Sequence, residues 1–417
     1  MFQTPPREGP LGSWLLVVLW TLVIYATIPI ARPLLKMVDR LWGADLLRWL
    51  SIAITVGAAG LAARYIYRQV PRLSGRRLAW LAAVVGVFLY LMLTKMKTPS
   101  EALHFLEYGL LGLLVWRALS HRVRDRWVYP CAVLVCMLVG MVDEILQWMM
   151  PGRFWDVRDI LHNGIAALLA QLAVAGGMRP PFIHGGTSPR SVRWFFSLSA
   201  AFLILVGLCA SNTPVAVDWY SGRLPALAFL RELDHPMSEY GYRYQTPETG
   251  RFYSRFRLED LAWLDQRRAE DAGRVIAHYL AHETYANFLS RYTPVTDPFV
   301  HEAMVHLHRR NHYAGASGRY LGQEDLYRRH VTVAYRENQI LERYFANTLA
   351  VSGQRWTEEM DAQFKPHLRT DRIYKSEVSR HLITQWSERQ LWLVIASLLL
   401  LDLIWLLRKG REPVPLL

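Results

Sequence analysis

The sequence predicts an all-α polytopic membrane protein with about eight transmembrane helices and a mainly α-helical extracytoplasmic domain between the last two. Three observations lead to this prediction. Hydrophobic residues make up 52% of the 417 residues, with 16 Trp, and they gather in runs long enough to span a bilayer. Residues 212–388 hold 23 Lys and Arg and 23 Asp and Glu, so the net charge of +13 lies in the apolar part of the chain. Within 212–388 the apolar residues recur with a helical period.

Eight apolar runs are the candidate spans. They cover Leu11–Ala31, Leu46–Ala63, Leu78–Thr94, Glu101–Leu119, Val128–Val142, Val157–Ala175, Trp194–Ala210 and Leu391–Leu407. The first follows Arg7 as a signal peptide would, but it is longer than a typical signal-peptide core and further spans follow, so we interpret it as an uncleaved helix. The short fifth run can span only if its Asp143 end lies in a polar recess lined by protein.

Basic residues near the spans predict the orientation, because cytoplasmic loops carry an excess of Lys and Arg. With both termini in the cytoplasm, the inner segments hold 16 of these residues and the short outer loops hold 8. Four basic residues after the first span run against this bias: Arg32, Lys36, Arg40 and Arg48. The bias places residues 212–388 outside the cytoplasm.

The predicted domains follow from the spans, the orientation and a Pro-, Gly- and Ser-rich stretch typical of a linker. They are a six-helix membrane domain (1–178), a cytoplasmic linker (179–193), a seventh transmembrane helix (194–211), an extracytoplasmic helical domain (212–388), an eighth transmembrane helix (389–408) and a cytoplasmic tail (409–417). In the extracytoplasmic domain we expect an irregular, aromatic-rich start at Trp219–Tyr253. Amphipathic helices are expected around Leu258–Leu264, Val275–Leu289, His301–His308 and Arg328–Leu349.

Three blocks of polar residues lie at the ends of spans four to six, where hydrocarbon would not tolerate them facing lipid. The first and third blocks have helical spacing i, i+3, i+7, and the second has i, i+4, so each block shares one face of a helix. The blocks are Glu101, His104 and Tyr108; Asp143 and Gln147, with Glu144 beside them; and Asp156, Asp159 and Asn163. This pattern predicts a polar site held by three helices.

The same blocks, with Phe105 after His104, Gly152-Arg153 before Asp156 and Gly164 after Asn163, resemble the VanZ-like membrane domain. The resemblance covers roughly residues 10–178, and the C-terminal half resembles no family in this way. It implies a bacterial inner-membrane protein of the cell envelope, since the family is named after a protein associated with resistance to the glycopeptide teicoplanin. It implies no particular reaction.

The polar site has two interpretations. As a functional site, its carboxylates would differ in pKa, so that one acts as an acid while another acts as a base. Its candidate catalytic residues are Glu101, His104, Asp143, Glu144 and Asp159, and its candidate substrate-binding residues are Tyr108, Gln147, Arg153, Asp156 and Asn163. The planar guanidinium of Arg153 suits phosphate, so the substrate would be a membrane lipid, a lipid-linked envelope precursor or another anionic amphiphile at the outer leaflet.

Alternatively, the polar blocks only pack the helices. The chain would then be a non-enzymatic membrane-anchored binding or assembly protein, whose residues 212–388 dock an envelope protein. Whether a reaction is catalysed stays open at this point.

Other function classes find little support. No basic patch interleaved with aromatic residues indicates nucleic-acid binding. Cys131, Cys136 and Cys209 lie in apolar runs without a CxxC pattern, and no sequence motif calls for a cofactor. A metal site built from His278, His282 and a residue of the helix at His301–His308 is a weaker alternative to ordinary surface and interhelix histidines.

Overall fold

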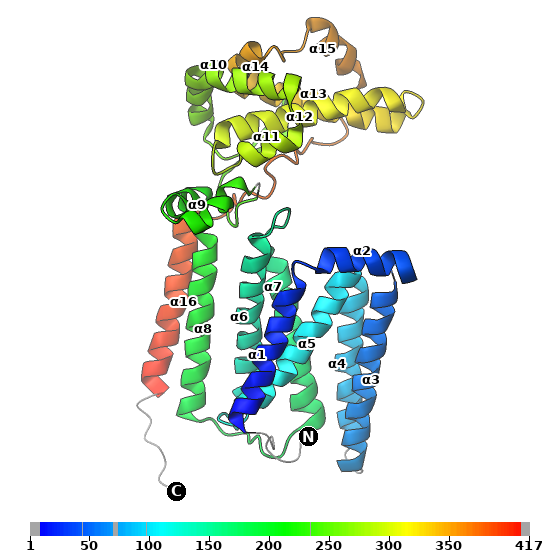
Figure 1. Cartoon of the computed structure of the whole chain (residues 1–417), viewed down its shortest axis with the longest axis vertical. Coiled ribbons are helices and arrows are strands. Elements are labelled where there is room, and N and C mark those ends of the chain that lie inside the picture. The colour runs from blue at the N-terminus through cyan, green and yellow to red at the C-terminus, as the bar shows by residue number, and fades with distance from the viewer. Residues whose placement is uncertain (1–8, 44, 70–73, 97, 234, 410–417) are drawn as a thin grey trace. The chain divides into compact units, whose positions relative to one another are not determined.

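The computed structural model describes residues 9–43, 45–69, 74–96, 98–233 and 235–409. It divides into two compact units, each described by itself here. The membrane unit comprises residues 1–206 and 394–417, and the insert unit comprises residues 207–393. Both are built mainly of helices, which confirms the predicted all-α membrane class (Figure 1).

Eight helices of the described residues are long and apolar enough to cross a membrane. They are α1 (Pro10–Thr27), α3 (Leu46–Gln69), α4 (Ser74–Thr94), α5 (Pro99–Leu119), α6 (Val128–Trp148), α7 (Val157–Leu172) with its π-helical extension η2 (Ala173–Met178), α8 (Pro189–Ala210) and α16 (Glu388–Lys409). A further helix, α2 (Ala31–Trp42), was not predicted and lies between the first two spans. Its 12 residues are too few to cross a bilayer.

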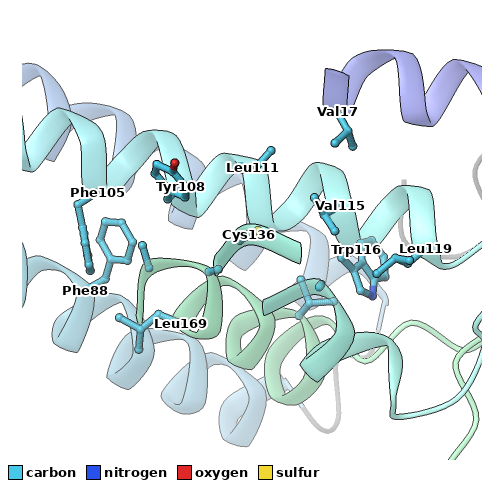
Figure 2. Packing of buried hydrophobic residues seen from close by; sticks show 14 of the residues in the cluster. Val17, Phe88, Phe105, Tyr108, Leu111, Val115, Trp116, Leu119, Cys136 and Leu169 are labelled. Atoms are coloured by element: carbon cyan, nitrogen blue, oxygen red, sulfur yellow. The ribbon is translucent and has the colours of Figure 1, made fainter. Parts of the chain in front are cut away.

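Helix α5 is the centre of the membrane unit. In the spans α5, α7 and α6 respectively 56%, 50% and 44% of residues are buried, against 22% or fewer in the other five. Figure 2 shows the buried face of α5, where Phe105 packs on Phe88 of α4 with ring centroids 4.5 Å apart. The polar blocks therefore sit on the three spans that are most enclosed by protein.

Glycines let these three helices approach closely. A Cβ atom at Gly112 of α5 would lie 3.1 Å from the Ala167 Cα of α7, and one at Gly140 of α6 would lie 3.0 Å from Asn163 Nδ2. At the same α5–α7 contact, Gln171 Nε2 donates a hydrogen bond of 2.9 Å to the carbonyl oxygen of Gly112. In lipid, helices have no hydrophobic driving force to associate. The close packing that small residues permit holds them together instead.

The insert unit begins with α9 (Pro214–Ser221) and the 3₁₀ helix η3 (Pro225–Glu232), followed by an antiparallel hairpin of β1 (Tyr242–Thr246) and β2 (Gly250–Ser254). The stretch Trp219–Tyr253, which was predicted to be irregular, therefore contains most of an ordered hairpin. Gly250 takes φ +71°, and a Cβ there would lie 2.6 Å from the Tyr374 carbonyl oxygen. Five-residue strands give too short an alternation to be recognised in the sequence.

Helices make up most of the rest of the insert. They are α10 (Leu258–His282), α11 (Tyr285–Arg291), α12 (Pro298–Ser317), η4 (Gly318–Tyr320), α13 (Glu324–Tyr344), α14 (Ala346–Ser352), α15 (Glu358–Phe364) and η5 (Lys365–His367). The stretch predicted as one helix at Val275–Leu289 is two, because Thr284 starts α11 by accepting a hydrogen bond from the Asn287 N–H. Phe299, Leu307 and Ile340 are fully buried in the shared core.

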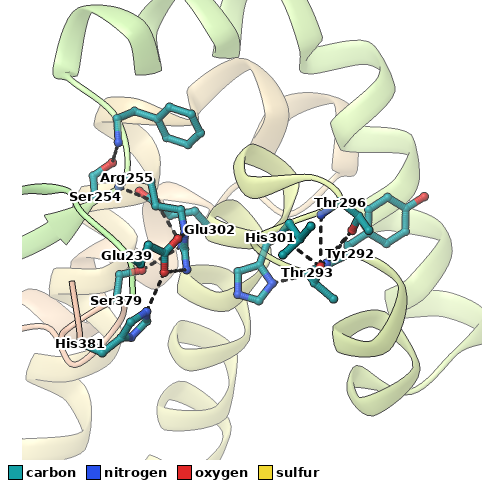
Figure 3. Close-up of polar contacts among 12 residues, drawn as sticks. Glu239, Ser254, Arg255, Tyr292, Thr293, Thr296, His301, Glu302, Ser379 and His381 are labelled. Atoms are coloured by element: carbon teal, nitrogen blue, oxygen red, sulfur yellow. Dashed lines mark hydrogen bonds and ion pairs between the residues drawn. The ribbon is translucent and has the colours of Figure 1, made fainter. Parts of the chain in front are cut away.

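A buried arginine joins the two ends of the insert (Figure 3). Arg255, just after the hairpin, donates to Glu239 Oε1 at 2.5 Å and to Ser379 Oγ at 3.1 Å, and its Nη1 lies 3.4 Å from Glu302 Oε2 on α12. His381 Nε2 lies 2.8 Å from Glu239 Oε2. Because Glu239 and Ser379 come from opposite ends of the insert, the chain enters and leaves this domain at one place.

Replacing Gly112 tests the close contact between α5 and α7. Gly112→Leu should destabilise the chain by about 1–3 kcal/mol, since the added side chain meets backbone. Gly86→Leu is the matched control, because a Cβ at Gly86 has nothing within 4 Å. Thermal unfolding of both variants in detergent measures the difference, and equal midpoints would contradict the close packing.

The insert should lose stability in acid. Burial alone would raise the pKa of Glu239, but Arg255 and His381 lower it to about 2. Burial lowers the pKa of His301 to about 3, and the charge of Arg255 adds to this effect. Both groups bind fewer protons when folded than when unfolded, so stability falls as pH drops from about 6.5 to 3 for His301 and from about 4.5 to 2 for Glu239.

Glu239→Gln separates the two contributions. It leaves Arg255 buried without its main counter-charge and should cost about 3–5 kcal/mol at neutral pH, while the loss of stability below pH 4.5 becomes shallower. Glu270→Gln is the control, because the Glu270 side chain is 72% exposed. Unfolding of the full chain, followed by intrinsic fluorescence across pH, would refute this account if both variants followed the wild-type profile.

Candidate functional site

The α5 block meets the α6 block at one carboxylate. Asp143 is fully buried, and its Oδ2 lies 2.9 Å from His104 Nε2. Tyr108 donates its hydroxyl hydrogen to the same oxygen at 3.4 Å. On its other side, His104 Nδ1 lies 3.2 Å from Glu107 Oε2, so the imidazole is held between two carboxylates.

The end of α6 extends this network toward the following loop. Gln147 Nε2 donates to Asp143 Oδ2 at 3.3 Å and to Glu144 Oε1 at 3.2 Å. Arg153 in turn donates to the Gln147 side-chain oxygen. A continuous chain of polar contacts thus runs from Tyr108 through Asp143 and Gln147 to Arg153.

The start of α7 is fixed by two carboxylates. Glu144 Oε2 accepts the Asp156 backbone N–H at 3.0 Å, and Asp156 caps α7 by accepting the Arg158 backbone N–H at 2.9 Å. Burial alone would raise the pKa of Asp156, but its contacts with Arg158 lower it overall, so Asp156 is an ionised cap. One turn further, Asp159 Oδ1 lies 3.8 Å from His162 Nδ1.

These ends surround a cavity of about 350 Å³ in the membrane unit. Six of the ten predicted site residues line it: Glu101, His104, Gln147, Arg153, Asp159 and Asn163. The other four do not: Tyr108, Asp143, Glu144 and Asp156. Through their contacts to His104, Gln147 and the start of α7, these four hold the lining residues in position.

The rest of the lining is mostly apolar. The first three helices and their connections supply Ile24, Ile28, Leu34, Val38 and Leu47, together with Thr27. The cavity lining therefore combines polar and apolar side chains. Ligand sites of this size usually combine an apolar lining with a few directed polar groups.

Two buried polar atoms at the site are unsatisfied. Asn163 is 1% exposed, and its Nδ2 has no hydrogen-bond partner in the described part of the chain. The same holds for Asp143 Oδ1. An unsatisfied buried polar atom costs about 1–3 kcal/mol, and Asn163 is among the residues that line the cavity.

Sequence reasoning missed two titratable residues of the lining, Glu107 and His162. Glu107 follows His104 at i+3, a spacing that would have placed it on the same stripe. The apolar wall gave no comparable signal, because an isoleucine that faces a cavity and one that faces lipid look alike in the sequence.

The arrangement can bind a polar ligand. His104 lines the cavity, with Nε2 against Asp143 and Nδ1 against Glu107, so both ring nitrogens already face a carboxylate. Arg153 adds a donor suited to phosphate, and Glu101 and Asp159 add acceptors for hydroxyl or amino groups.

The histidines of the insert have other partners. His301 Nδ1 lies 2.7 Å from the Tyr292 carbonyl oxygen, His306 Nδ1 lies 2.5 Å from Glu337 Oε2, and His308 stacks on Tyr285 with centroids 3.6 Å apart. His278 and His282 lie on one face of α10, with ring centroids 5.3 Å apart. Across the described residues, no group of three or more His, Cys, Asp or Glu is arranged to hold a metal ion.

Comparison with protein families identifies the membrane unit. The model of the VanZ/LLP1 family matches residues 14–175, which run from α1 into η2 and contain all three polar blocks. Neither curated proteins nor solved structures gave a match to the chain. The match covers less than half of the chain and leaves the insert unassigned. Within the chain, residues 14–175 are therefore similar to the VanZ/LLP1 family.

Proposed function

We propose that this multi-pass membrane protein of the cell envelope binds an amphiphile in the cavity of its VanZ-like domain. The observation that supports this function is a single cavity lined by both polar and apolar side chains. An amphiphile would place its headgroup against Arg153, Asn163 and the carboxylates, and its first hydrocarbon segments against Ile28, Leu34 and Leu47.

The polar wall favours a particular headgroup. Arg153 can pair with a phosphate through two parallel hydrogen bonds, while Glu101, Glu107 and Asp159 accept from hydroxyl or amino groups. A phosphate that carries sugar or amine donors matches both requirements, whereas a simple fatty acid can pair with Arg153 but has no donor for the carboxylates. A lipid-linked envelope precursor is therefore the proposed ligand class.

A variant of Asn163 distinguishes a ligand-binding site from a network that only packs the helices. In Asn163→Ala no hydrogen bond within the described residues is lost, so the thermal midpoint should stay level or rise while the bound lipid is lost. The measurement is lipid-resolved mass spectrometry of the protein purified in mild detergent, together with thermal unfolding. Leu161→Ala is the control on the same helix, because Leu161 is 51% exposed.

Asp143→Ala is the reference for a variant that loses contacts between the helices. It removes the partner of His104, Tyr108 and Gln147 and should cost about 3–5 kcal/mol. If Asn163→Ala lost as much stability as Asp143→Ala, or kept its lipid, the polar blocks would be a packing network. The rival function of an assembly protein would then be favoured.

We infer that both termini are cytoplasmic and that the insert is extracytoplasmic, because Lys and Arg flank the spans in a 16 to 8 ratio in that orientation. In a bacterium this puts the insert on the outer face of the inner membrane, where it can meet an envelope protein. Residues 212–388 carry 23 Lys and Arg and 23 Asp and Glu, so their charge gives no preference for a strongly charged partner.

Single cysteines test this topology. Leu321→Cys in the insert, at a side chain 72% exposed, should react with a membrane-impermeant maleimide in intact spheroplasts. Arg190→Cys, exposed at the start of α8, should react only after permeabilisation. The native cysteines Cys131, Cys136 and Cys209 are buried and give a low background. The reverse labelling pattern would show the opposite orientation.

A further inference from the structure

Helix α2 divides its residues between two faces. Leu34, Met37, Val38 and Leu41 follow the spacing i, i+3, i+4, i+7 that places side chains on one side of a helix. The charged residues Lys36, Asp39 and Arg40 fall on the other side and are exposed. This is the division expected of a helix between water and an apolar layer.

The apolar face is only partly covered by the protein. Leu34 and Val38 line the cavity together with Leu47, but Met37 and Leu41 remain 49% and 60% exposed. Trp42, at the end of α2, is 64% exposed. Figure 1 shows that α2 runs across the ends of the spans and not along them. Helix α2 thus lies at one end of the bundle of spans.

We propose that α2 is a membrane-surface helix whose apolar face enters the bilayer and whose Lys36 and Arg40 bind anionic phospholipid headgroups. Three features favour a lipid surface as the partner. The helix is too short to span and connects two spans, so it must lie close to the bilayer surface. Its exposed tryptophan is typical of the interface. Its three basic residues, Arg32, Lys36 and Arg40, outnumber Asp39, which matches anionic headgroups.

This assignment gives the basic residues after the first span a role. Lys36 and Arg40 counted against the predicted orientation when treated as loop charges. On a surface helix they are headgroup ligands and need no cytoplasmic location. Because Leu34 and Val38 also line the cavity, α2 forms a wall between that cavity and the membrane surface. The inference concerns α2 alone and does not depend on what the cavity binds.

Site-specific fluorescence tests the proposal on the full chain in nanodiscs. Met37→Cys and Asp39→Cys are each labelled with an environment-sensitive dye, in phosphatidylcholine with or without phosphatidylglycerol. We expect blue-shifted emission and quenching by a lipid-borne nitroxide at position 37, and neither at position 39. Phosphatidylglycerol should shift the emission at position 37 further to the blue, and Lys36→Gln with Arg40→Gln should abolish that response.

Three results would overturn the proposal. Equal quenching at positions 37 and 39 would show that α2 has no lipid-facing side. A blue-shifted but unquenched label at position 37 would show that protein, such as a second copy of the chain, covers this face. If phosphatidylglycerol gave no response, or if the response persisted in the Lys36→Gln, Arg40→Gln variant, Lys36 and Arg40 would not be ligands of anionic headgroups.

Discussion

The membrane unit is organised around the contacts of one buried carboxylate. Asp143 has no exposure to solvent, and a charged or polar group in this setting is costly unless other groups contact it. His104 and Tyr108 from α5, and Gln147 from the next turn of α6, provide those contacts. The polar residues therefore fix how α5 meets α6, and Glu144 extends the same control to the first turn of α7.

A site of this kind needs helices that approach one another closely and yet leave space at one end. Gly112 brings α5 and α7 together deep in the bundle, and Gly140 makes room for Asn163. Toward the ends of the same helices the polar side chains diverge around the cavity. Close helix packing beside a cavity with polar and apolar lining is what the proposed amphiphile-binding site requires, and Asn163 belongs to both, since it lies next to Gly140 and lines the cavity.

Much of this fold could be predicted because its signals are local. Apolar runs defined the eight spans, and helical spacing grouped the polar residues into three blocks, each on one face of a helix. The missed features depend on contacts between distant segments. Whether Ile28 faces lipid or a cavity, and how Arg255 joins Glu239 to Ser379, cannot be read from periodicity. Helix α2 was missed because its charges resemble those of a loop.

A structure of the full chain in lipid nanodiscs, determined by electron cryomicroscopy, tests the central claim most directly. The account predicts elongated density in the cavity, with its polar end between Asn163 and Arg153 and its tail along Ile28 and Leu34. A cavity closed by its own side chains, with the Asn163 amide bonded to protein, would contradict it. The three polar blocks would then serve only to hold the helices together.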